Sequence, residues 1–392
     1  MTDHPATGVD HDRQLIQDAR AKGRGALFGA FAKLSGPGWL QSAITLGGGS
    51  LASALFLGVV GGYAVLWVQA GAIILGVIML SAIGYVTLST GESPFESMRT
   101  RINPVLAWGW ILAALAANMV FVLPQYSLAF GALTENIFPS LGAYASSFGF
   151  KMGVSLLILA VVASVTFLYG SGGIGIRIYE TIVKAVVGMI VITFILVVIK
   201  LSLSKPGLPL GRILAGFIPD PNMIFSPSEA YQQVLETINS DAAREFWSGK
   251  ALAKQRTVLV AAASAAVGIN MTFMLPYSMR ARGWGKSHRG LASFDLATGM
   301  VIPFIIATSC IVIASGHLFH GKPYEGVLEQ SNGQVVVTSD PAYAAQAREV
   351  QAMVSERSDT VGSNTQVEAG ELQLAAMLLN RSNRQFARSL EA

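Results

Sequence analysis

The sequence predicts an all-α integral membrane protein. Of its 392 residues, 52% are hydrophobic and only 13% are charged, and the mean hydropathy is +0.52. These values exclude a water-soluble globular protein, whose surface needs more charge. The apolar residues gather in seven stretches that are close to the length of about 20 residues needed by a transmembrane helix. They lie at 37–60, 62–87, 104–133, 152–170, 176–201, 257–279 and 293–316.

Basic residues between these stretches predict the orientation of the chain. The chain has a net charge of +4, and Lys and Arg residues lie in short polar segments before span one and after spans two, four and six. Because cytoplasmic loops carry an excess of Lys and Arg, we expect a multi-pass protein of the cell (inner) membrane with a cytoplasmic N-terminus. From this pattern we expect the lipid bilayer to be the partner of the chain, and we expect no binding to nucleic acid. The residues are Arg13, Arg20, Lys22, Arg24, Lys33, Arg99, Arg101, Arg177, Arg280, Arg282, Lys286 and Arg289.

This orientation divides the chain into five parts. We expect a cytoplasmic tail, a first repeat of five spans, an extracytoplasmic connection, the start of a second repeat with spans six and seven, and a second extracytoplasmic segment. Neither polar segment shows catalytic spacing, and the five His residues form no ligand pattern, so no enzyme is expected. The five parts are 1–34, 35–203, 204–256, 257–316 and 317–392.

Spans one and six contain residues that interrupt a helix. Gly47, Gly48 and Gly49 follow one another in span one, and each interior Gly costs a helix about 1 kcal/mol relative to Ala. Span six contains Asn270 and Pro276, and a proline removes one backbone donor. A close helix crossing or a simple kink is the alternative for either feature alone. Two interrupted helices separated by four continuous ones match the first members of two inverted five-helix repeats, whose midpoints form a binding site.

Short motifs in the first spans carry a resemblance to a known family. They are Gly36-Pro-Gly-Trp-Leu, Gly61-Gly-Tyr63, Leu66-Trp-Val68, Thr90-Gly91 and Arg99, followed by Glu180, Pro276 and Asp295. These motifs resemble those of the Nramp (natural resistance-associated macrophage protein) metal transporters, over roughly residues 33–316. The resemblance implies the leucine-transporter fold and a divalent metal cation as the transported substrate.

The resemblance also implies where the metal site lies and how it differs. The family's Asp-Pro-Gly-Asn motif falls on residues 47–50, where Gly47 replaces the carboxylate and Ser50 replaces the amide. A metal-binding Ala carbonyl falls on Thr272, and the family's Met-Pro-His falls on residues 275–277. The acidic residues of the third span are missing. The expected substrate pathway therefore consists of Leu46, Gly47, Gly48, Gly49, Ser50, Asn118, Gln125, Thr272, Leu275, Pro276 and Tyr277.

The residue types in this pathway favour a hard cation. Hydroxyl and carbonyl oxygens suit Mg and Ca, whereas a thioether together with a carboxylate suits Mn and Fe. Ser50 and Thr272 are the expected metal contacts, directly or through water, and Mg keeps its waters readily. No cofactor is expected. The alternative is that these polar groups only satisfy one another.

Two charged pairs and one cysteine have simpler explanations. Glu180 and Lys184 are spaced i, i+4 and form at most a weak helix-surface pair. Asp295 either joins an inner-gate ion pair with nearby Arg residues or is a first-turn carboxylate favoured by its helix dipole. Cys310 lies in an apolar stretch and is expected to be a buried hydrophobe.

These features bear on three candidate functions of the chain. A divalent cation transporter is favoured by the two helix breaks, and a non-transporting scaffold or sensor is favoured by the loss of the family's ligands. A membrane enzyme has no supporting motif.

Only spans six and seven of the second repeat are present, so we expect the chain to be the front part of a longer protein, with the segment after Glu371 leading to an eighth span. The sequence defines no oligomeric state.

Overall fold

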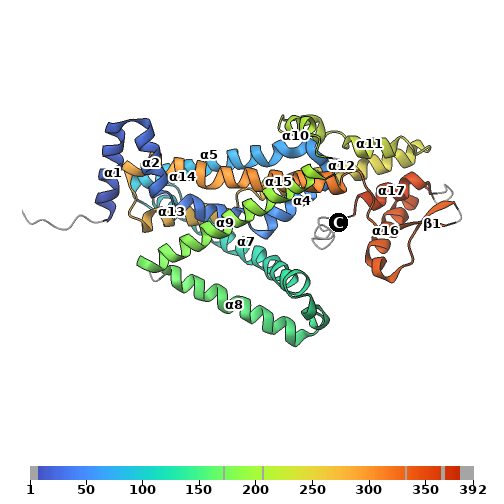
Figure 1. Cartoon of the computed structure of the whole chain (residues 1–392), viewed down its shortest axis with the longest axis horizontal. Helices are drawn as coiled ribbons and strands as arrows, with labels where there is room; N and C mark the ends of the chain where they lie inside the picture. The colour runs from blue at the N-terminus through green and yellow to red at the C-terminus, as the bar shows by residue number, and fades with distance from the viewer. Residues whose placement is uncertain (1–7, 171–172, 205–206, 332, 363–366, 380–392) are drawn as a thin grey trace, which may run out of the picture. The chain divides into compact units, whose positions relative to one another are not determined.

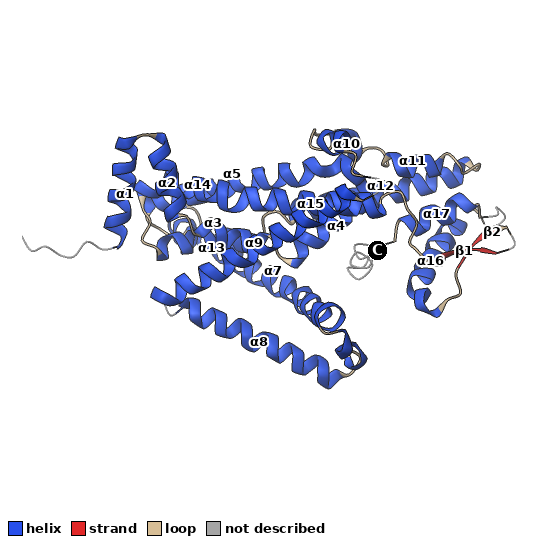
Figure 2. Cartoon of the chain, viewed as in Figure 1, coloured by secondary structure: helices blue, strands red, loops and turns tan. Residues whose placement is uncertain are grey.

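The computed structural model describes residues 8–170, 173–204, 207–331, 333–362 and 367–379. In this part of the chain, helices dominate, and the strands β1 (Leu328–Ser331) and β2 (Gln334–Val337) form one antiparallel hairpin (Figure 2). In this hairpin Glu329 pairs with Val336. Figure 1 gives the element labels used below.

Six stretches of helix in the described residues are long and apolar enough to cross a membrane. The prediction of an all-α membrane protein is therefore confirmed, while seven separate spans and an inverted repeat stay predictions. The first stretch holds 43 residues, about twice the length that a bilayer requires, and contains the predicted second span as well as the end of the first. The six are Gly48–Thr90, Pro104–Thr134, Phe148–Phe167, Thr181–Leu203, Asp241–Ala281 and Lys286–Phe319.

The chain divides into two compact units. The first comprises residues 1–50, 72–193 and 265–307. Its elements are α1 (Gly8–Lys22), α2 (Arg24–Leu34), α3 (Pro37–Thr45), most of α5 (Leu66–Thr90), α6 (Pro94–Arg101), α7 (Pro104–Gly131), η2 (Ala132–Ile137), η3 (Pro139–Tyr144), α8 (Phe148–Gly170), most of α9 (Gly173–Leu203), α13 (Ile269–Ala281), η5 (Lys286–His288), α14 (Arg289–Leu296) and η6 (Ala297–Val301).

Long helices of the first unit expose apolar side chains. Val105 and Leu123 of α7 and Phe167 of α8 are each more than 70% exposed, and none of the apolar α8 window is buried. A water-soluble protein does not tolerate so large an apolar surface, whereas lipid covers it at no cost. These helices therefore fit a bilayer environment.

The second unit comprises residues 51–71, 194–264 and 308–392 and holds an apolar core. Trp247 and Tyr231 lie at its centre, at 0% and 1% exposure. Helices α4 and α15 approach closely, because a Cβ on Gly58 would lie 2.0 Å from Oγ of Ser315. The elements are most of α4 (Gly48–Gly61), η1 (Gly62–Val65), α10 (Leu210–Ala215), η4 (Pro221–Ile224), α11 (Glu229–Leu235), α12 (Asp241–Ser264), most of α15 (Ile302–Phe319), the hairpin, η7 (Pro341–Tyr343), α16 (Ala344–Val361) and α17 (Ala369–Met377).

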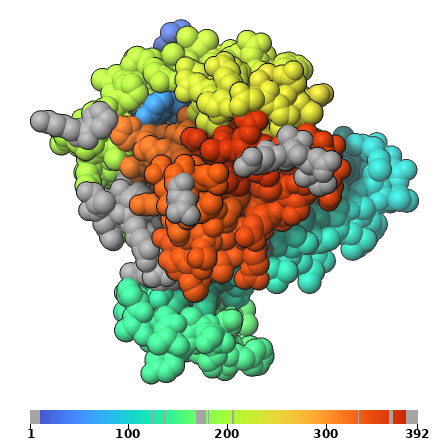
Figure 3. All heavy atoms as spheres, turned by 90° about the vertical axis from the view of Figure 1, so that its right-hand side faces the viewer, coloured from blue at the N-terminus to red at the C-terminus, as the bar shows by residue number. Residues whose placement is uncertain are grey.

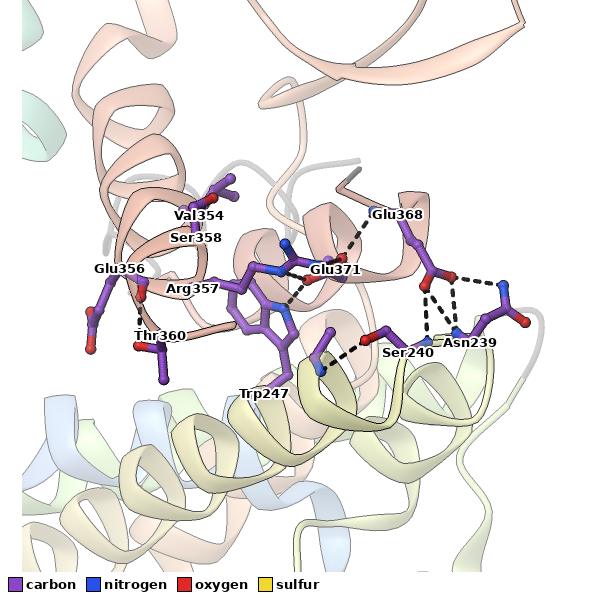
Figure 4. Close-up of polar contacts among 11 residues, drawn as sticks. Asn239, Ser240, Trp247, Val354, Glu356, Arg357, Ser358, Thr360, Glu368 and Glu371 are labelled. Atoms are coloured by element: carbon purple, nitrogen blue, oxygen red, sulfur yellow. Dashed lines mark hydrogen bonds and ion pairs between the residues drawn. The ribbon is translucent and has the colours of Figure 1, made fainter. Parts of the chain in front are cut away.

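The two polar segments of the second unit pack on each other. We call the described residues of 207–256 and 317–379 the polar module, and Figure 3 shows its α11–α12 part, in yellow, beside α16 and α17, in orange to red. At its centre the guanidinium of Arg357 donates two hydrogen bonds to the carboxylate of Glu371, at 2.6 and 2.9 Å, and both side chains are fully buried (Figure 4). The indole of Trp247 donates to the same carboxylate at 2.7 Å. The two polar segments thus form one folded module.

The helix breaks differ in part from the prediction. Helix α3 ends at Thr45 and α4 begins at Gly48, so span one is interrupted at Leu46 and Gly47. Gly48 and Gly49, which were also expected to interrupt the helix, belong to α4. The prediction of a break at Pro276 is wrong, because α13 continues through this proline. The interruption lies earlier, at residues 265–268, where Gly268 precedes the first residue of α13. Helix α12, which leads into this break, begins at Asp241.

Candidate functional site

The two helix breaks meet in the first unit. Ser50 lies at the start of α4, is 7% exposed, and donates a hydrogen bond from Oγ to the backbone carbonyl of Ala265 at 2.9 Å. Ala265 is the first residue of the interruption between α12 and α13. The midpoints of the two broken helices are therefore directly joined.

Polar backbone groups gather at the first break. The amide of Leu46 donates to the carbonyl of Ser42 at 2.8 Å, and the amide of Ser50 donates to the carbonyl of Gly47 at 3.1 Å. A helix leaves its last carbonyls and its first amides without intrahelical partners. The end of α3 and the start of α4 therefore place polar backbone groups together within a strongly apolar sequence.

Helix α7 supplies an amide side chain to this break. A Cβ on Gly48 would lie 3.4 Å from Oε1 of Gln125 and 2.8 Å from Cδ1 of Leu128, so glycine permits this approach. A Cβ on Gly49 would lie 3.8 Å from Nε2 of Gln125. Asn118 lies seven residues before Gln125, on the same helix face. Its amide donates to the carbonyl of Ala114 of its own helix at 2.8 Å.

The candidate residues of α13 occupy three different environments. The hydroxyl of Thr272 donates to the carbonyl of Ile269 at 2.6 Å. Leu275 and Pro276 are buried. Tyr277 is 41% exposed and continues an aromatic stack, with its ring 5.6 Å from that of Phe273, which in turn lies 4.5 Å from Trp110 of α7.

Sequence reasoning missed three polar residues of α3. The hydroxyl of Thr45 donates to the carbonyl of Gln41 at 2.9 Å and also contacts Sδ of Met271 at 3.5 Å. Gln41 and Ser42 are completely buried. The available signal was the presence of three polar side chains within five residues of an otherwise apolar span.

The comparison with protein families shows the family of the chain. The family model described as natural resistance-associated macrophage protein-like, Nramp, matches residues 38–338. The chain belongs to the Nramp family. A comparison with individual curated proteins gave no match. Nramp proteins are transporters and not enzymes, so membership implies transport of a divalent metal cation across a membrane.

At the breaks of this Nramp protein, the atoms with lone pairs for a metal ion are mainly oxygen atoms. Ser50 and Thr272 each donate their proton to a backbone carbonyl, which leaves the hydroxyl oxygen lone pairs available. Met271 brings a thioether close by, and its sulfur accepts from Thr45. Among the described residues, no group of three His, Cys, Asp or Glu side chains is placed to hold a metal ion.

Asp295 holds the start of α3 in this Nramp protein. Its buried carboxylate accepts hydrogen bonds from the amides of Gly36 and Gly38, at 3.0 and 2.6 Å, and from the hydroxyl of Ser35. Asp295 lies in the last turn of α14, so the first-turn explanation is wrong. The carboxylate accepts hydrogen bonds from N-terminal amides of α3, and it therefore stabilises the dipole of α3. We find the carboxylate acting as a cap for a neighbouring helix.

Basic side chains converge on the same segment. Nζ of Lys184 donates to the carbonyl of Ser35 at 3.3 Å, and the guanidinium of Arg282 donates to that of Leu34 at 3.5 Å. The side chain of Glu180, predicted to pair with Lys184, lies outside the described residues. Residues 34–38 are thus held by three elements at the entrance to α3.

Proposed function

We propose that this Nramp protein transports a hard divalent cation, Mg²⁺ in preference to Mn²⁺ or Fe²⁺, along a path through its two helix breaks. The observation that carries the proposal is the hydrogen bond between Ser50 and Ala265, which brings the breaks together. Interrupted membrane helices that meet in this way form the substrate sites of secondary transporters.

The chemical type of the metal-binding groups supports a hard cation as the substrate. Gly47 and Leu275 offer no side-chain ligand, and the groups near the first break are the hydroxyl of Ser50, the amide of Gln125 and backbone carbonyls. Hydroxyl and carbonyl oxygens bind Mg and Ca better than softer ions. The thioether of Met271 lies 3.5 Å from the hydroxyl of Thr45, and it is a single soft ligand without the carboxylate that would suit Mn or Fe.

Hydration of the ion follows from the absence of a carboxylate in the predicted pathway. Moving even a monovalent ion of ammonium size from water into an apolar medium costs about 20 kcal/mol in the idealised case. A divalent ion costs more, and dipoles offset only part of this cost. Mg²⁺ keeps several waters in most protein sites. In our proposal, Ser50, Thr272 and Gln125 therefore contact the water shell of the ion.

Uniport driven by the membrane potential fits the same residues. Gly47, Phe121 and Tyr277 stand where the family tends to place titratable groups, and none of them carries a carboxylate or an imidazole. The architecture that we propose is the leucine-transporter fold with seven spans. It is supported by the positions of the breaks, which interrupt the first helix of each proposed repeat.

Uptake into proteoliposomes tests this function. Vesicles that contain the purified protein and a pH-sensitive dye receive Mg²⁺, Ca²⁺ or Mn²⁺ under an inside-negative potential. We expect Mg²⁺ uptake to exceed Mn²⁺ uptake without stoichiometric acidification of the interior. Faster Mn²⁺ uptake would overturn the selectivity, coupled acidification would overturn uniport, and absence of all uptake would favour a scaffold or sensor built around the polar module.

A further inference from the structure

Gln41 and Ser42 of α3 are buried polar side chains without partners in the described structure. Both are 0% exposed, and neither the amide oxygen and nitrogen of Gln41 nor the hydroxyl of Ser42 forms a hydrogen bond there. An unsatisfied buried polar group is strongly unfavourable, and native structures rarely keep one without a water, an ion or a functional role. Two consecutive residues of this kind indicate that a polar ligand, such as water or an ion, reaches these side chains.

The direction of both side chains follows from their neighbours on α3. Gly38, one turn earlier, faces α14, because a Cβ there would lie 2.1 Å from the carbonyl of Asp295. Thr45, one turn later, contacts Met271 of α13. Residues three or four apart share one face of a helix. Gln41 and Ser42 therefore lie on the face of α3 that packs within the first unit, between Asp295 and the first break.

The helix opposite this face is irregular. Helix η6, residues Ala297–Val301, is a π-helical turn that packs against α3, and a Cβ on Gly299 would lie 3.1 Å from the backbone of Gly38 and Trp39. Such turns occur frequently at functional sites because they displace backbone carbonyls from the regular ladder. The carboxylate of Asp295 lies next to Gly38 and adds negative charge. The guanidinium of Arg282 lies beside Gly36, and its positive charge offsets the negative charge of Asp295.

We propose that Gln41 and Ser42 form a second binding step for a hydrated hard divalent cation, on the α3 side of the first break. This inference rests on the proposed function and adds residues to the path. The amide oxygen and the hydroxyl accept hydrogen bonds from the water shell of the ion, and they keep it hydrated as it passes. The ion with its waters supplies the partners that both side chains lack in the protein.

The variants Gln41→Leu and Ser42→Ala test the proposal in the Mg²⁺ uptake assay and in thermal unfolding with and without Mg²⁺. Loss of hydrogen bonds to the ion's water shell should raise the half-saturating Mg²⁺ concentration about tenfold in Gln41→Leu and less in Ser42→Ala. The thermal midpoint without Mg²⁺ should not fall in Gln41→Leu, because an unsatisfied amide is removed. Gln41→Glu should bind Mg²⁺ more tightly, since it adds a negative charge.

Gln69→Leu in α5 is the matched control. Gln69 is 1% exposed and its amide also has no partner in the described structure, but it lies outside the proposed path. Unchanged uptake in Gln69→Leu with weakened uptake in Gln41→Leu supports the inference. Unchanged Mg²⁺ uptake in Gln41→Leu, with uptake intact in the unmodified protein, would overturn the inference alone. No Mg²⁺ uptake and no Mg²⁺-dependent thermal shift in the unmodified protein would overturn the proposed function and the inference with it.

Discussion

Ser50 and Ala265 join two parts of the chain that are 215 residues apart in sequence. The hydroxyl of Ser50 donates to the carbonyl of Ala265 at 2.9 Å, at a point where both helices are interrupted. A carbonyl in a helix break has no intrahelical donor, so the serine satisfies a group that would otherwise be unpaired. One hydroxyl therefore connects the geometry of the two breaks.

Ser50→Ala removes this connection. We expect the free energy of unfolding to fall by about 1 kcal/mol and the rate of cation uptake to fall, because the carbonyl of Ala265 loses its donor. Ser264→Ala is the control, since its exposed hydroxyl donates only to Ala261 of its own helix in the described contacts. Equal uptake by both variants would show that the bond does not organise the site.

Restoring the family pattern should change the ion that binds. Gly47→Asp combined with Leu275→Met introduces a carboxylate and a thioether, which together suit Mn²⁺. A Cβ on Gly47 would lie 3.2 Å from the carbonyl of Ile44, so the aspartate requires the backbone there to shift by a few tenths of an ångström. We expect calorimetry to show tighter Mn²⁺ binding by the double variant than by Leu275→Met alone. Without such a gain, the alignment of residues 47–50 with the family motif would be wrong.

The buried ion pair of the polar module should matter for stability. Glu371→Gln leaves the guanidinium of Arg357 buried without its counter-charge, and breaking such a pair costs about 3–5 kcal/mol. We expect a clearly lower thermal midpoint for this variant. Arg357→Met combined with Glu371→Leu should recover much of the loss, because neither charge remains buried. A single variant as stable as the unmodified protein would contradict this account.

Glu368 should make the polar module sensitive to acid. Its carboxylate accepts hydrogen bonds from the backbone amide of Asn239, at 3.0 and 3.1 Å, which lower its pKa, and the amide of Ser240 acts in the same direction. A lowered pKa stabilises the fold above the ordinary carboxyl pKa of about 4.3, and this contribution is lost as the pH falls below that value. Thermal unfolding between pH 7 and about pH 3.5 should therefore show a steeper loss of stability for the unmodified protein than for Glu368→Gln.

Features set by local sequence could be predicted, because they depend on residues close together. The run of glycines predicted an interruption of span one, and the break lies at Leu46 and Gly47, while Gly48 and Gly49 are helical. Pro276 misled the prediction for span six. A proline in a membrane helix needs only local adjustment, and neighbouring helices can satisfy the freed backbone, so α13 continues through it.

Features set by tertiary contacts could not be predicted from the sequence. The role of Asp295 depends on amides of residues 36 and 38, more than 250 positions away. The partner of Ser50 is a backbone carbonyl, which carries no residue-specific signal. Gln41 and Ser42 were visible as polar residues in an apolar span, but only their complete burial without partners distinguishes them from packing residues.

Location of a hydrated cation at the breaks tests the central claim most directly. Cobalt(III) hexammine resembles hydrated Mg²⁺ and cannot exchange its ligands, and its anomalous scattering can be located in crystals of the protein. We predict a cobalt peak about 4–5 Å from Oγ of Ser50 or Oε1 of Gln125, which is the distance of one metal–ligand bond and one hydrogen bond. No cobalt peak at the breaks, together with an Mn²⁺ peak in direct contact with protein atoms there, would contradict the account.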